Sequence, residues 1–396
     1  MARLFCVYSA KSVVCLLLTA AASFAQPYSI AAAPPVSMPA RTVDGNSPAF
    51  RDEHGILHVY TSTGAEPMRM SGPSVTELAV DLHAPSVEPR NHYPIWIEGI
   101  WRDEDGTVYG WYHHEPNAQE ICGSRKLTTP RIGALVSSDG GVTFTDLGLV
   151  LTSEDQPNCS AQNGFFAGGH GDFSVIPDRD RQYFYFLFTN YGGSASHHGI
   201  AIARMAFADR ANPVGTVHKY FLGEWSEPGV GGMVTPVFAA TTSWDRSDAD
   251  SFWGAAVHWN TKLESYVAVM NRACCKANWP QEGIYISFNP DLAHPEQFTH
   301  PAKLVDAREI GFAPGYYPQV FGLGEGETDS LVGQDARLFI KGFSKWRLAF
   351  GEEQGEESLP TEPPPEECQS AECPVMPPGI GVSTSRRSPA SPARMR

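Results

Sequence analysis

The segment EGIWRDEDGTVYGWYHHE (residues 98–115) has a layout that recurs along the chain. A short apolar stretch comes first, an acidic turn follows, and a strand rich in aromatic and β-branched residues comes last. The same layout is present in SPAFRDEHGILHVYTS (47–62) and in DFSVIPDRDRQYFYFLFTN (172–190). Apolar runs bounded by glycine and Asx turns are typical of β-hairpins, so each segment is predicted to form two adjacent strands.

Two looser copies complete the series. They are WGAAVHWNTKLESYVAVMN (253–271) and YPQVFGLGEGETDSLVGQDARLFIKG (317–342). No stretch holds a helical period over three turns, so we expect an all-β protein. Five strand-turn-strand units predict a five-bladed β-propeller in which each blade is a four-stranded sheet. A two-sheet sandwich is the alternative, but it gives no reason for one layout to recur.

The N-terminal 25 residues have the composition of a secretory signal. Arg3 and Lys11 supply positive charge, and an apolar run too short to span a bilayer follows. Ser23-Phe24-Ala25 fits the small-x-small cleavage rule. We therefore expect residues 1–25 to be a signal peptide that is cleaved after Ala25, and the mature protein to be secreted or periplasmic.

The remaining flanks differ in composition from the repeats. Residues 26–41 are rich in proline and alanine, and we expect a flexible leader there. Residues 351–396 are acidic and proline-rich at first, then basic and rich in serine and proline, which predicts a disordered tail. The propeller is therefore expected to occupy residues 42–350.

The charge balance excludes some partners. The chain carries 29 basic and 44 acidic residues, for a net charge of −15. This balance argues against nucleic acid and against an anionic membrane surface as the main partner. We expect a monomer.

Six cysteines remain after the expected cleavage. An exported chain meets an oxidising compartment, which favours disulfides. Cys122 and Cys159 form the preferred pair, because both lie in loops that flank one hairpin region. The neighbours Cys274 and Cys275 are not expected to bond to each other. No CxxC spacing occurs, so no zinc site is predicted.

The acids of two repeats fall at one position. When the second and third units are aligned on Tyr109 and Tyr183, each has an acid eleven residues earlier, Glu98 and Asp172. The first unit has Ser47 at the same place. Because the innermost strand of each blade lines the central channel of a propeller, Glu98 and Asp172 are predicted to face one polar pocket.

Two carboxyl groups in one pocket suit glycoside hydrolysis, in which one is protonated and acts as the acid. The other stays ionised as a base or orienting group. Asp172, Glu98 and Asp44, which lies three residues before Ser47, are therefore the candidate catalytic residues. The alternative is that these acids bind a structural calcium ion, cap turns or pair with an arginine. No cofactor is expected.

Other residues are candidates for contact with a carbohydrate. His170 shares strand parity with Asp172, and Ser47 occupies the equivalent position in the first unit. Aromatic side chains can stack on sugar rings, although on inner strands they are more often core. The candidate substrate-binding residues are His170, Ser47, Trp253, His258, Tyr317 and Glu282. For His258 a solvated side chain near a turn is the alternative, and for Glu282 a turn cap.

The layout resembles the five-bladed propeller glycoside hydrolases, the group that contains arabinanases, β-xylosidases and invertase-like enzymes. The likeness covers most of residues 42–350. It implies that Asp172 in GDFSVIPD corresponds to the middle-blade aspartate of that family, which has a tuning or orienting role. DGNSPAFRDEHG resembles the first-blade motif, but Ser47 stands where the family has its aspartate, which leaves Asp44 as the substitute.

The acid of that family is a glutamate in a later blade. The fourth unit, DSFWGAAVHW, has no glutamate there, so Glu98 in WIEG would take its place from another blade. The chain also resembles a group of secreted bacterial proteins of unassigned function with WIE…GWYH, GDFS and FWG…HWN segments.

Two further interpretations remain. SSDGGVTF (137–144) fits the Asp-box pattern of sialidases and related propellers, in which Asp139 fixes a hairpin turn. A sialidase would need clustered arginines for the substrate carboxylate, and the arginines here are scattered in sequence. The rival to an enzyme is a non-catalytic propeller that binds a glycan or another partner.

Overall fold

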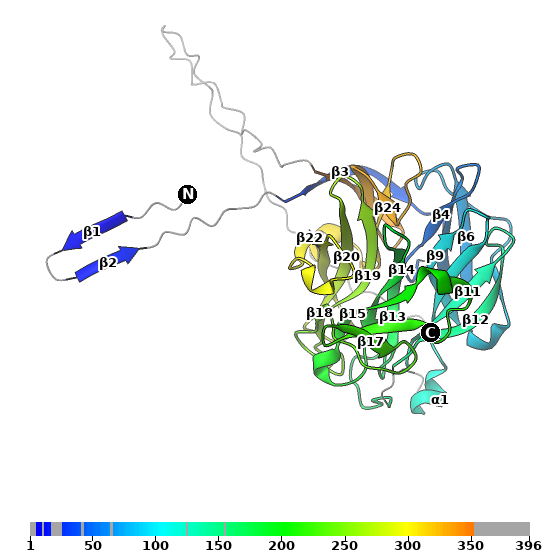
Figure 1. Cartoon of the computed structure of the whole chain (residues 1–396), viewed down its shortest axis with the longest axis horizontal. Helices are drawn as coiled ribbons and strands as arrows, with labels where there is room; N and C mark the ends of the chain where they lie inside the picture. The colour runs from blue at the N-terminus through cyan, green and yellow to red at the C-terminus, as the bar shows by residue number, and fades with distance from the viewer. Residues whose placement is uncertain are drawn as a thin grey trace, which may run out of the picture. The chain divides into compact units, whose positions relative to one another are not determined.

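The chain forms five sheets around a common axis, so the predicted five-bladed β-propeller is confirmed (Figure 1). Each of the five sequence repeats supplies the two innermost strands of one blade. The computed structural model describes residues 5–9, 12–16, 26–40, 43–63, 66–123, 126–153 and 156–351.

Blades 1 and 2 come from the first half of the chain. Blade 1 comprises β4 (Ala49–Arg51), β5 (Leu57–Thr63), β6 (Glu66–Gly72) and β7 (Ala79–Val80). Blade 2 comprises β9 (Ile95–Arg102), β10 (Val108–His114), β11 (Arg131–Ser137), β12 (Thr143–Leu151) and β8 (Ser86–Glu88), with β8 parallel to β12.

Blades 3 and 4, like blade 2, carry more strands than the four expected for each blade. Blade 3 comprises β13 (His170–Pro177), β14 (Tyr183–Asn190), β15 (Gly199–Ala206), β16 (Val217–Phe221) and β17 (Glu224–Pro228), with β18 (Phe238–Ala239) also paired to β15. Blade 4 comprises β19 (Asp250–Asn260), β20 (Ser265–Cys274), β21 (Gln281–Asn289), β22 (Ala302–Asp306) and β24 (Leu331–Val332), which runs parallel to β19.

Blade 5 joins the two ends of the ring. It comprises β23 (Pro318–Gly322), β25 (Asp335–Ile340), β26 (Phe343–Phe350) and β3 (Tyr28–Ser37). The expected flexible leader over 26–41 is therefore wrong, because β3 pairs antiparallel with β26 and covers its outer edge. Proline is tolerated in β3 because an edge strand needs only one row of ladder hydrogen bonds.

The other elements are short. β1 (Phe5–Ser9) and β2 (Ser12–Leu16) pair only with each other, and the expected cleavage site at Ala25 lies outside the described residues, as does the expected tail from 352 onward. The helices are α1 (Ala118–Cys122), α2 (Ala307–Ile310) and the 3₁₀ turns η1 (Arg90–His92), η2 (Ala195–His197), η3 (Phe207–Ala211) and η4 (Pro295–Gln297). In the described part of the chain, no helix has the length and apolar character needed to cross a membrane.

The core consists of apolar layers between neighbouring blades. In β14, Phe184, Phe186 and Phe188 pack toward blade 2, whereas Tyr185 and Leu187 pack toward blade 4. Successive side chains of a strand point to opposite faces, and both faces of this strand are covered. That explains why QYFYFLFTNY reads as a continuous apolar run.

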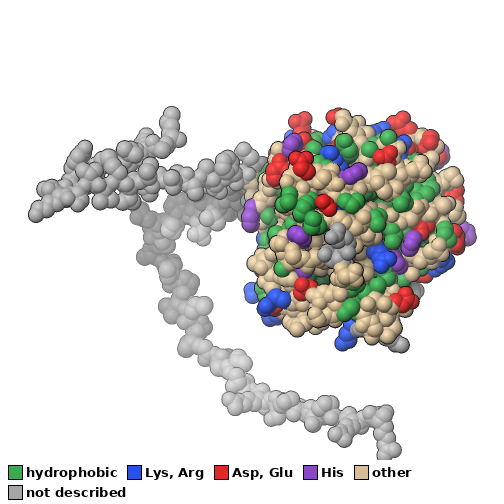
Figure 2. Space-filling model, turned by 60° about the horizontal axis from the view of Figure 1, so that its bottom comes forward, with side chains coloured by type: hydrophobic (Ala, Val, Ile, Leu, Met, Phe, Trp, Pro, Cys, Tyr) green, Lys and Arg blue, Asp and Glu red, His purple; other side chains and the backbone are tan. Residues whose placement is uncertain are grey.

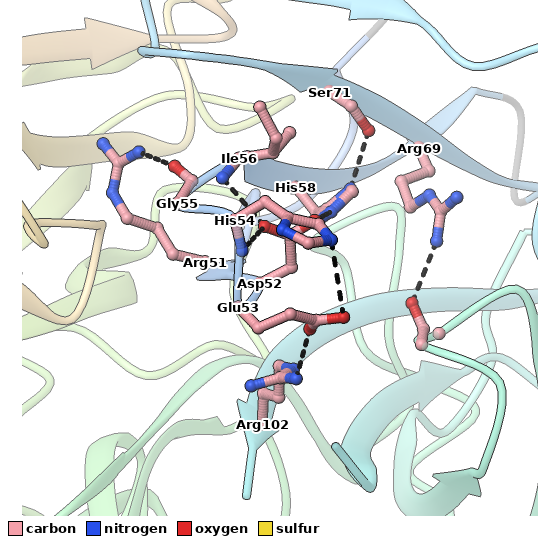
Figure 3. Close-up of polar contacts among 12 residues, drawn as sticks. Arg51, Asp52, Glu53, His54, Gly55, Ile56, His58, Arg69, Ser71 and Arg102 are labelled. Atoms are coloured by element: carbon pink, nitrogen blue, oxygen red, sulfur yellow. Dashed lines mark hydrogen bonds and ion pairs between the residues drawn. The ribbon is translucent and has the colours of Figure 1, made fainter. Parts of the chain in front are cut away.

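The acidic turns of the repeats cap their hairpins. Oδ1 of Asp52 accepts hydrogen bonds from the backbone amides of His54 and Ile56, each at 2.9 Å (Figure 3). Asp178 accepts in the same way from the amide of Gln182. These turns lie at the C-terminal ends of the innermost strands, and their aspartates have a structural role.

The Asp52 carboxylate also begins a series of side-chain contacts that crosses blade 1. His58 Nε2 lies 3.2 Å from Asp52 Oδ2, and His58 Nδ1 lies 2.7 Å from Ser71 Oγ (Figure 3). His58 and Ser71 are direct cross-strand partners. Because Asp52 is the hairpin cap that recurs in other blades, we interpret this Asp–His–Ser arrangement as part of the sheet framework.

The cysteines form two disulfides within the described residues. Cys122 and Cys159 are bonded, as predicted, and tie α1 to the loop that precedes blade 3. Cys274 and Cys275 are also bonded to each other, so the contrary expectation is wrong. Cys275 has a φ of 72°, which turns the chain sharply out of β20 and brings the two side chains together.

On the face shown in Figure 2, acidic and basic side chains are interspersed.

Candidate functional site

A pocket of about 260 Å³ lies where the N-terminal ends of the innermost strands converge. Acidic, histidine and lysine side chains from four blades line it. They are Asp44, Glu98, His113, Glu115, Asp172 and Lys341. The three carboxyl groups singled out in the sequence are therefore brought to one cavity, together with a histidine, a glutamate and a lysine that sequence reasoning missed.

Glu98 and Asp172 occupy equivalent β-bulges. In blade 2 the register passes from Gly99 to Ile97 opposite consecutive residues of β10, which leaves Glu98 as the extra residue. In blade 3 it passes from Gly171 to Phe173, which leaves Asp172. A bulge re-aims one side chain out of the alternating pattern of its strand. Both carboxyl groups therefore point into the pocket although they interrupt buried strands.

Blade 4 has a bulge at the corresponding place, but it carries no functional side chain. The register shifts between Trp253 and Ala256, and Gly254 adopts a φ of 57° there. A Cβ on Gly254 would lie 2.9 Å from Nδ2 of the Asn271 side chain. The fourth blade therefore supplies no acid, in agreement with its sequence.

Glu98 is buried on the pocket floor. Its side chain is 1% exposed, and Oε2 accepts a hydrogen bond from the backbone amide of Phe173 at 2.8 Å. A Cβ on Gly45 would lie 2.7 Å from Oε1, so glycine is required at that position. Burial raises the pKa of Glu98, although the contact with His113 opposes this shift.

Asp172 is held next to Glu98 by an aromatic hydroxyl. The Tyr191 hydroxyl donates a hydrogen bond to Asp172 Oδ2. Asp172 has a φ of 44°, a left-handed conformation that non-glycine residues seldom adopt and that is consistent with its bulge. Burial, together with the nearby Glu98 carboxylate, raises the pKa of Asp172 to about 7. Asp172 can thus hold a proton near neutral pH.

His113 connects the two acids. Its Nδ1 accepts a hydrogen bond from the backbone amide of Asp172 at 3.2 Å and lies 3.8 Å from Glu98 Oε1. Its Nε2 lies 3.5 Å from Glu115 Oε1. Burial alone would lower the pKa of His113, but the contacts with Glu115 and Glu98 outweigh it and raise the pKa well above its usual value.

The glycines of GGHGD make room for this arrangement. A Cβ on Gly171 would lie 2.6 Å from Cε1 of His113, and a Cβ on Gly169 would lie 2.5 Å from the carbonyl oxygen of Pro130. The strand that carries Asp172 can therefore approach blade 2 only without side chains at these positions.

Aromatic side chains form the wall of the pocket. Trp96, Phe166, Trp253, Trp279, Tyr316 and Tyr317 line it. The indole NH of Trp96 donates to Asp44 Oδ2 at 3.4 Å and so links the wall to the third carboxyl group, which is partly exposed. The ring of Trp279 stacks on that of Tyr191 with centroids 5.6 Å apart. The aromatic wall thus supports the tyrosine that binds Asp172.

Four of the expected substrate-contact residues lie outside this pocket. Ser47 is buried, and its backbone exchanges hydrogen bonds with the Gln319 side chain, which joins blades 1 and 5. His170 is buried against the ring of Phe188. Both residues therefore lie in the protein interior, and neither the strand parity of His170 nor the repeat position of Ser47 brings it to the pocket.

The other two are also displaced from the pocket lining. His258 is not solvated at a turn but is 1% exposed and packs against Phe350, and burial lowers its pKa to about 3. Glu282 forms an ion pair with Lys303 and accepts a hydrogen bond from the Tyr285 hydroxyl at 2.7 Å. These contacts account for both side chains without a ligand.

The acids and the histidine could be considered as metal ligands. Donor atoms of Glu98, His113 and Asp172 lie within 4.8 Å of one another. However, the Phe173 amide, the Asp172 amide and the Tyr191 hydroxyl already direct hydrogens at these atoms. These hydrogen bonds involve Oε2 of Glu98 and Oδ2 of Asp172, so the second oxygen of each carboxyl group remains a potential ligand. The cluster therefore has the donor set for a metal ion as well as the proximity needed to share a proton.

The sequence contains one indication that His113 lies in the pocket. It lies on the strand paired with β9, just beyond the bulge that carries Glu98. A histidine across from a candidate acid could have been included on that ground. Tyr191 and Trp279 follow or lie between strands, and no repeat position identifies them.

Comparisons with known proteins found no matching family model and no matching curated protein. Among solved structures, an endo-arabinase from Bacteroides thetaiotaomicron is 13% identical, with a TM-score of 0.49 over 81% of this chain and 97% of that one. A thermostable family-43 glycoside hydrolase is 11% identical, with a TM-score of 0.47 over 79% and 91%. An exo-1,5-α-L-arabinanase from a bovine ruminal metagenomic library is 12% identical, with a TM-score of 0.43 over 78% and 92%. At these identities no residue of the chain takes a role from its counterpart in those proteins.

Proposed function

We propose that the protein hydrolyses glycosidic bonds in the pocket at the centre of the propeller. The observation that carries this proposal is the convergence of Asp44, Glu98 and Asp172 on one aromatic-lined cavity. Glycoside hydrolysis needs one carboxyl group that is protonated and another that is ionised. Burial separates these roles here, because Glu98 and Asp172 are buried and Asp44 is partly exposed.

Glu98 and Asp172 act as a proton-sharing pair in this proposal. Carboxyl oxygens of the two lie within 4.8 Å of each other. Two carboxyl groups at such a distance do not readily ionise together, so one of them keeps a proton near neutral pH. We assign the general acid to Glu98 and its tuning to Asp172. Asp44 is then the base that activates water.

The pocket favours a small carbohydrate unit. Its volume of about 260 Å³ lies at the small end of the range for ligand pockets. The aromatic wall offers ring faces on which the apolar side of a sugar can stack. We therefore expect a terminal sugar unit to enter the pocket, with the rest of the chain outside.

The test is a screen of the purified protein against arabinan, galactan and xylan oligosaccharides and the matching aryl glycosides. The expected result is release of sugar by the wild type and a loss of about 10²–10⁴-fold in Glu98→Gln and in Asp172→Asn, as for removal of a general acid or base. Asp52→Asn is the matched control, because Asp52 caps a hairpin away from the pocket. It should keep the wild-type rate.

A glycan-binding propeller without activity is the second candidate. The hydrogen bond from the Phe173 amide to Glu98 favours it, because it gives that carboxylate a structural partner. Calorimetric binding of an oligosaccharide with no turnover, unchanged by Glu98→Gln, would establish this alternative and refute hydrolysis.

We also propose that the chain is exported and cleaved after Ala25. The disulfide between Cys122 and Cys159 supports an oxidising compartment. N-terminal sequencing of protein recovered from the culture medium or periplasm should begin at Gln26. A mature protein that retains Met1 would contradict the proposal.

A further inference from the structure

A second cavity of about 200 Å³ adjoins the pocket next to blade 2. Its lining includes Pro94, Glu115, Pro116, Thr128, Phe165 and Phe166. Glu115, Phe165 and Phe166 also line the pocket, so the two spaces share one wall. Neither alone reaches the roughly 300 Å³ at which ligand pockets usually begin, whereas the two together exceed it. The combined space therefore suits a ligand longer than one sugar unit.

The second cavity lies on the side of the pocket that carries Glu98. His113 connects the two, because its Nδ1 lies 3.8 Å from Glu98 Oε1 and its Nε2 lies 3.5 Å from Glu115 Oε1. Glu115 is 30% exposed and lines both spaces. In glycoside hydrolysis the general acid protonates the leaving oxygen, so the leaving unit lies on the side of the acid. A unit that leaves beside Glu98 thus faces the second cavity.

Phe165 presents an aromatic ring at the junction of the two spaces. The residue is 40% exposed, and its ring lies against that of Trp279 with centroids 4.8 Å apart. Pro94 and Pro116 add apolar surface to the second cavity. An exposed ring face can take the apolar side of a sugar, and the Glu115 carboxylate can accept hydrogen bonds from its hydroxyl groups. The junction therefore offers both kinds of contact that a sugar unit needs.

The backbone holds Phe165 in this position. Oδ1 of Asn163 accepts a hydrogen bond from the Phe165 amide at 2.7 Å. The Phe165 carbonyl oxygen accepts from the Thr128 amide at 3.0 Å, which joins two walls of the second cavity. Cys159, four residues before Asn163, is bonded to Cys122 at the end of α1. A ring on a fixed backbone has less freedom to lose when a ligand binds, which favours affinity.

We propose that the second cavity binds the next sugar unit of the substrate, with Phe165 as its stacking surface. This proposal rests on the hydrolytic function proposed above, because it states where the leaving part of the same substrate lies. The terminal unit occupies the pocket, and the bond to be cleaved lies between Glu98 and the second cavity. The protein therefore acts on chains of at least two units in preference to simple glycosides. Phe165 contacts only the leaving unit and determines this specificity.

The first arm of the test is calorimetry on Glu98→Gln, which keeps the shape of the pocket without turnover. The probes are the methyl glycosides, disaccharides and trisaccharides of arabinose, galactose and xylose. A methyl group is too small to fill a cavity of about 200 Å³. In the series that binds, the disaccharide should bind about 10-fold more tightly than the methyl glycoside, as for one good aromatic contact. The trisaccharide should bind about as tightly as the disaccharide.

The second arm changes Phe165 in the active protein. Phe165→Ala should raise the KM for the disaccharide about 10-fold and leave that for the methyl glycoside unchanged. Phe165→Tyr keeps the ring and should stay near the wild type. Phe312→Ala is the matched control, because Phe312 is 37% exposed and lines neither the pocket nor the second cavity. It should leave both KM values unchanged.

The outcomes separate this proposal from the hydrolytic function. Cleavage with equal KM values for the methyl glycoside and the disaccharide would overturn the second subsite and leave hydrolysis standing. An equal rise in both KM values in Phe165→Ala would show a purely structural role and would also overturn it. Tighter binding of the disaccharide without any cleavage by the wild type would refute hydrolysis and leave the second cavity as part of a glycan-binding site. Failure of every probe to bind would overturn both proposals.

Discussion

Replacing Asp172 by asparagine should stabilise the fold at alkaline pH. Burial and the neighbouring Glu98 carboxylate raise the pKa of Asp172 from 3.8 to about 7. A difference of roughly 3 pKa units corresponds to about 4 kcal/mol, at 1.36 kcal/mol per unit. That figure is an upper limit for the cost of ionising Asp172 in the folded protein, because Glu98 shares the titration.

The direction in which stability changes with pH follows from proton binding at Asp172. Between about pH 4 and pH 7 the folded protein binds a proton at Asp172 that the unfolded chain has released. Stability contributed by the neutral form is fully present below pH 4 and is lost as the pH rises through about 7. Asparagine carries no charge, so Asp172→Asn should unfold at a higher temperature than the wild type at pH 8 and at a similar temperature at pH 4.

Asp52→Asn is the matched control with the opposite sign. Burial alone would raise the pKa of Asp52, but hydrogen bonds from His58 and two backbone amides outweigh it and hold that pKa below its usual value. Its contribution is therefore present above the unfolded pKa and lost as the pH falls. Asp52→Asn should lose about 1 kcal/mol at pH 8, as for a lost hydrogen bond. Calorimetry at both pH values measures each variant, and a lower melting temperature for Asp172→Asn at pH 8 would refute the reasoning.

Three further variants test other contacts. Tyr191→Phe removes the hydroxyl that binds Asp172, so the pKa of Asp172 should rise further and the alkaline limb of the pH–rate profile, where the shared proton is lost, should shift upward; an unchanged profile would contradict this. Replacing Cys122 and Cys159 by serine opens a link across 37 residues and should cost up to about 4 kcal/mol in denaturant unfolding, whereas an unchanged midpoint would show that the link adds nothing. Gly171→Ala would place a methyl group 2.6 Å from an imidazole carbon and should reduce sugar release with little change in far-UV circular dichroism; wild-type activity would count against the tight packing.

The repeat made the propeller predictable from the sequence. Each unit contains one complete hairpin, so its strands, its acidic turn and its buried aromatic residues are all set locally. β3 was missed because its sequence is rich in proline and alanine, and its pairing partner lies more than 300 residues away. Local composition cannot report a contact at that distance.

The site was predictable only where the repeat specified it. Glu98 and Asp172 were found because both occupy the same bulge in their blades, although a bulge cannot be read from alternation alone. His170 was misplaced for the same reason, since the bulge at Asp172 reverses the strand parity from which its position was inferred. Trp279 reaches the pocket from a loop, where no periodicity applies.

The pairing of β3 with β26 also sets the order in which the protein can fold. Blades 1 to 4 are built from segments close in sequence, but blade 5 needs Tyr28 and Phe350 side by side. Closing a loop of that length costs roughly 5 kcal/mol of chain entropy. We therefore expect this contact to form last, after the C-terminal strand has been synthesised. Until then blade 5 presents an open strand edge, the kind of surface at which chains associate wrongly.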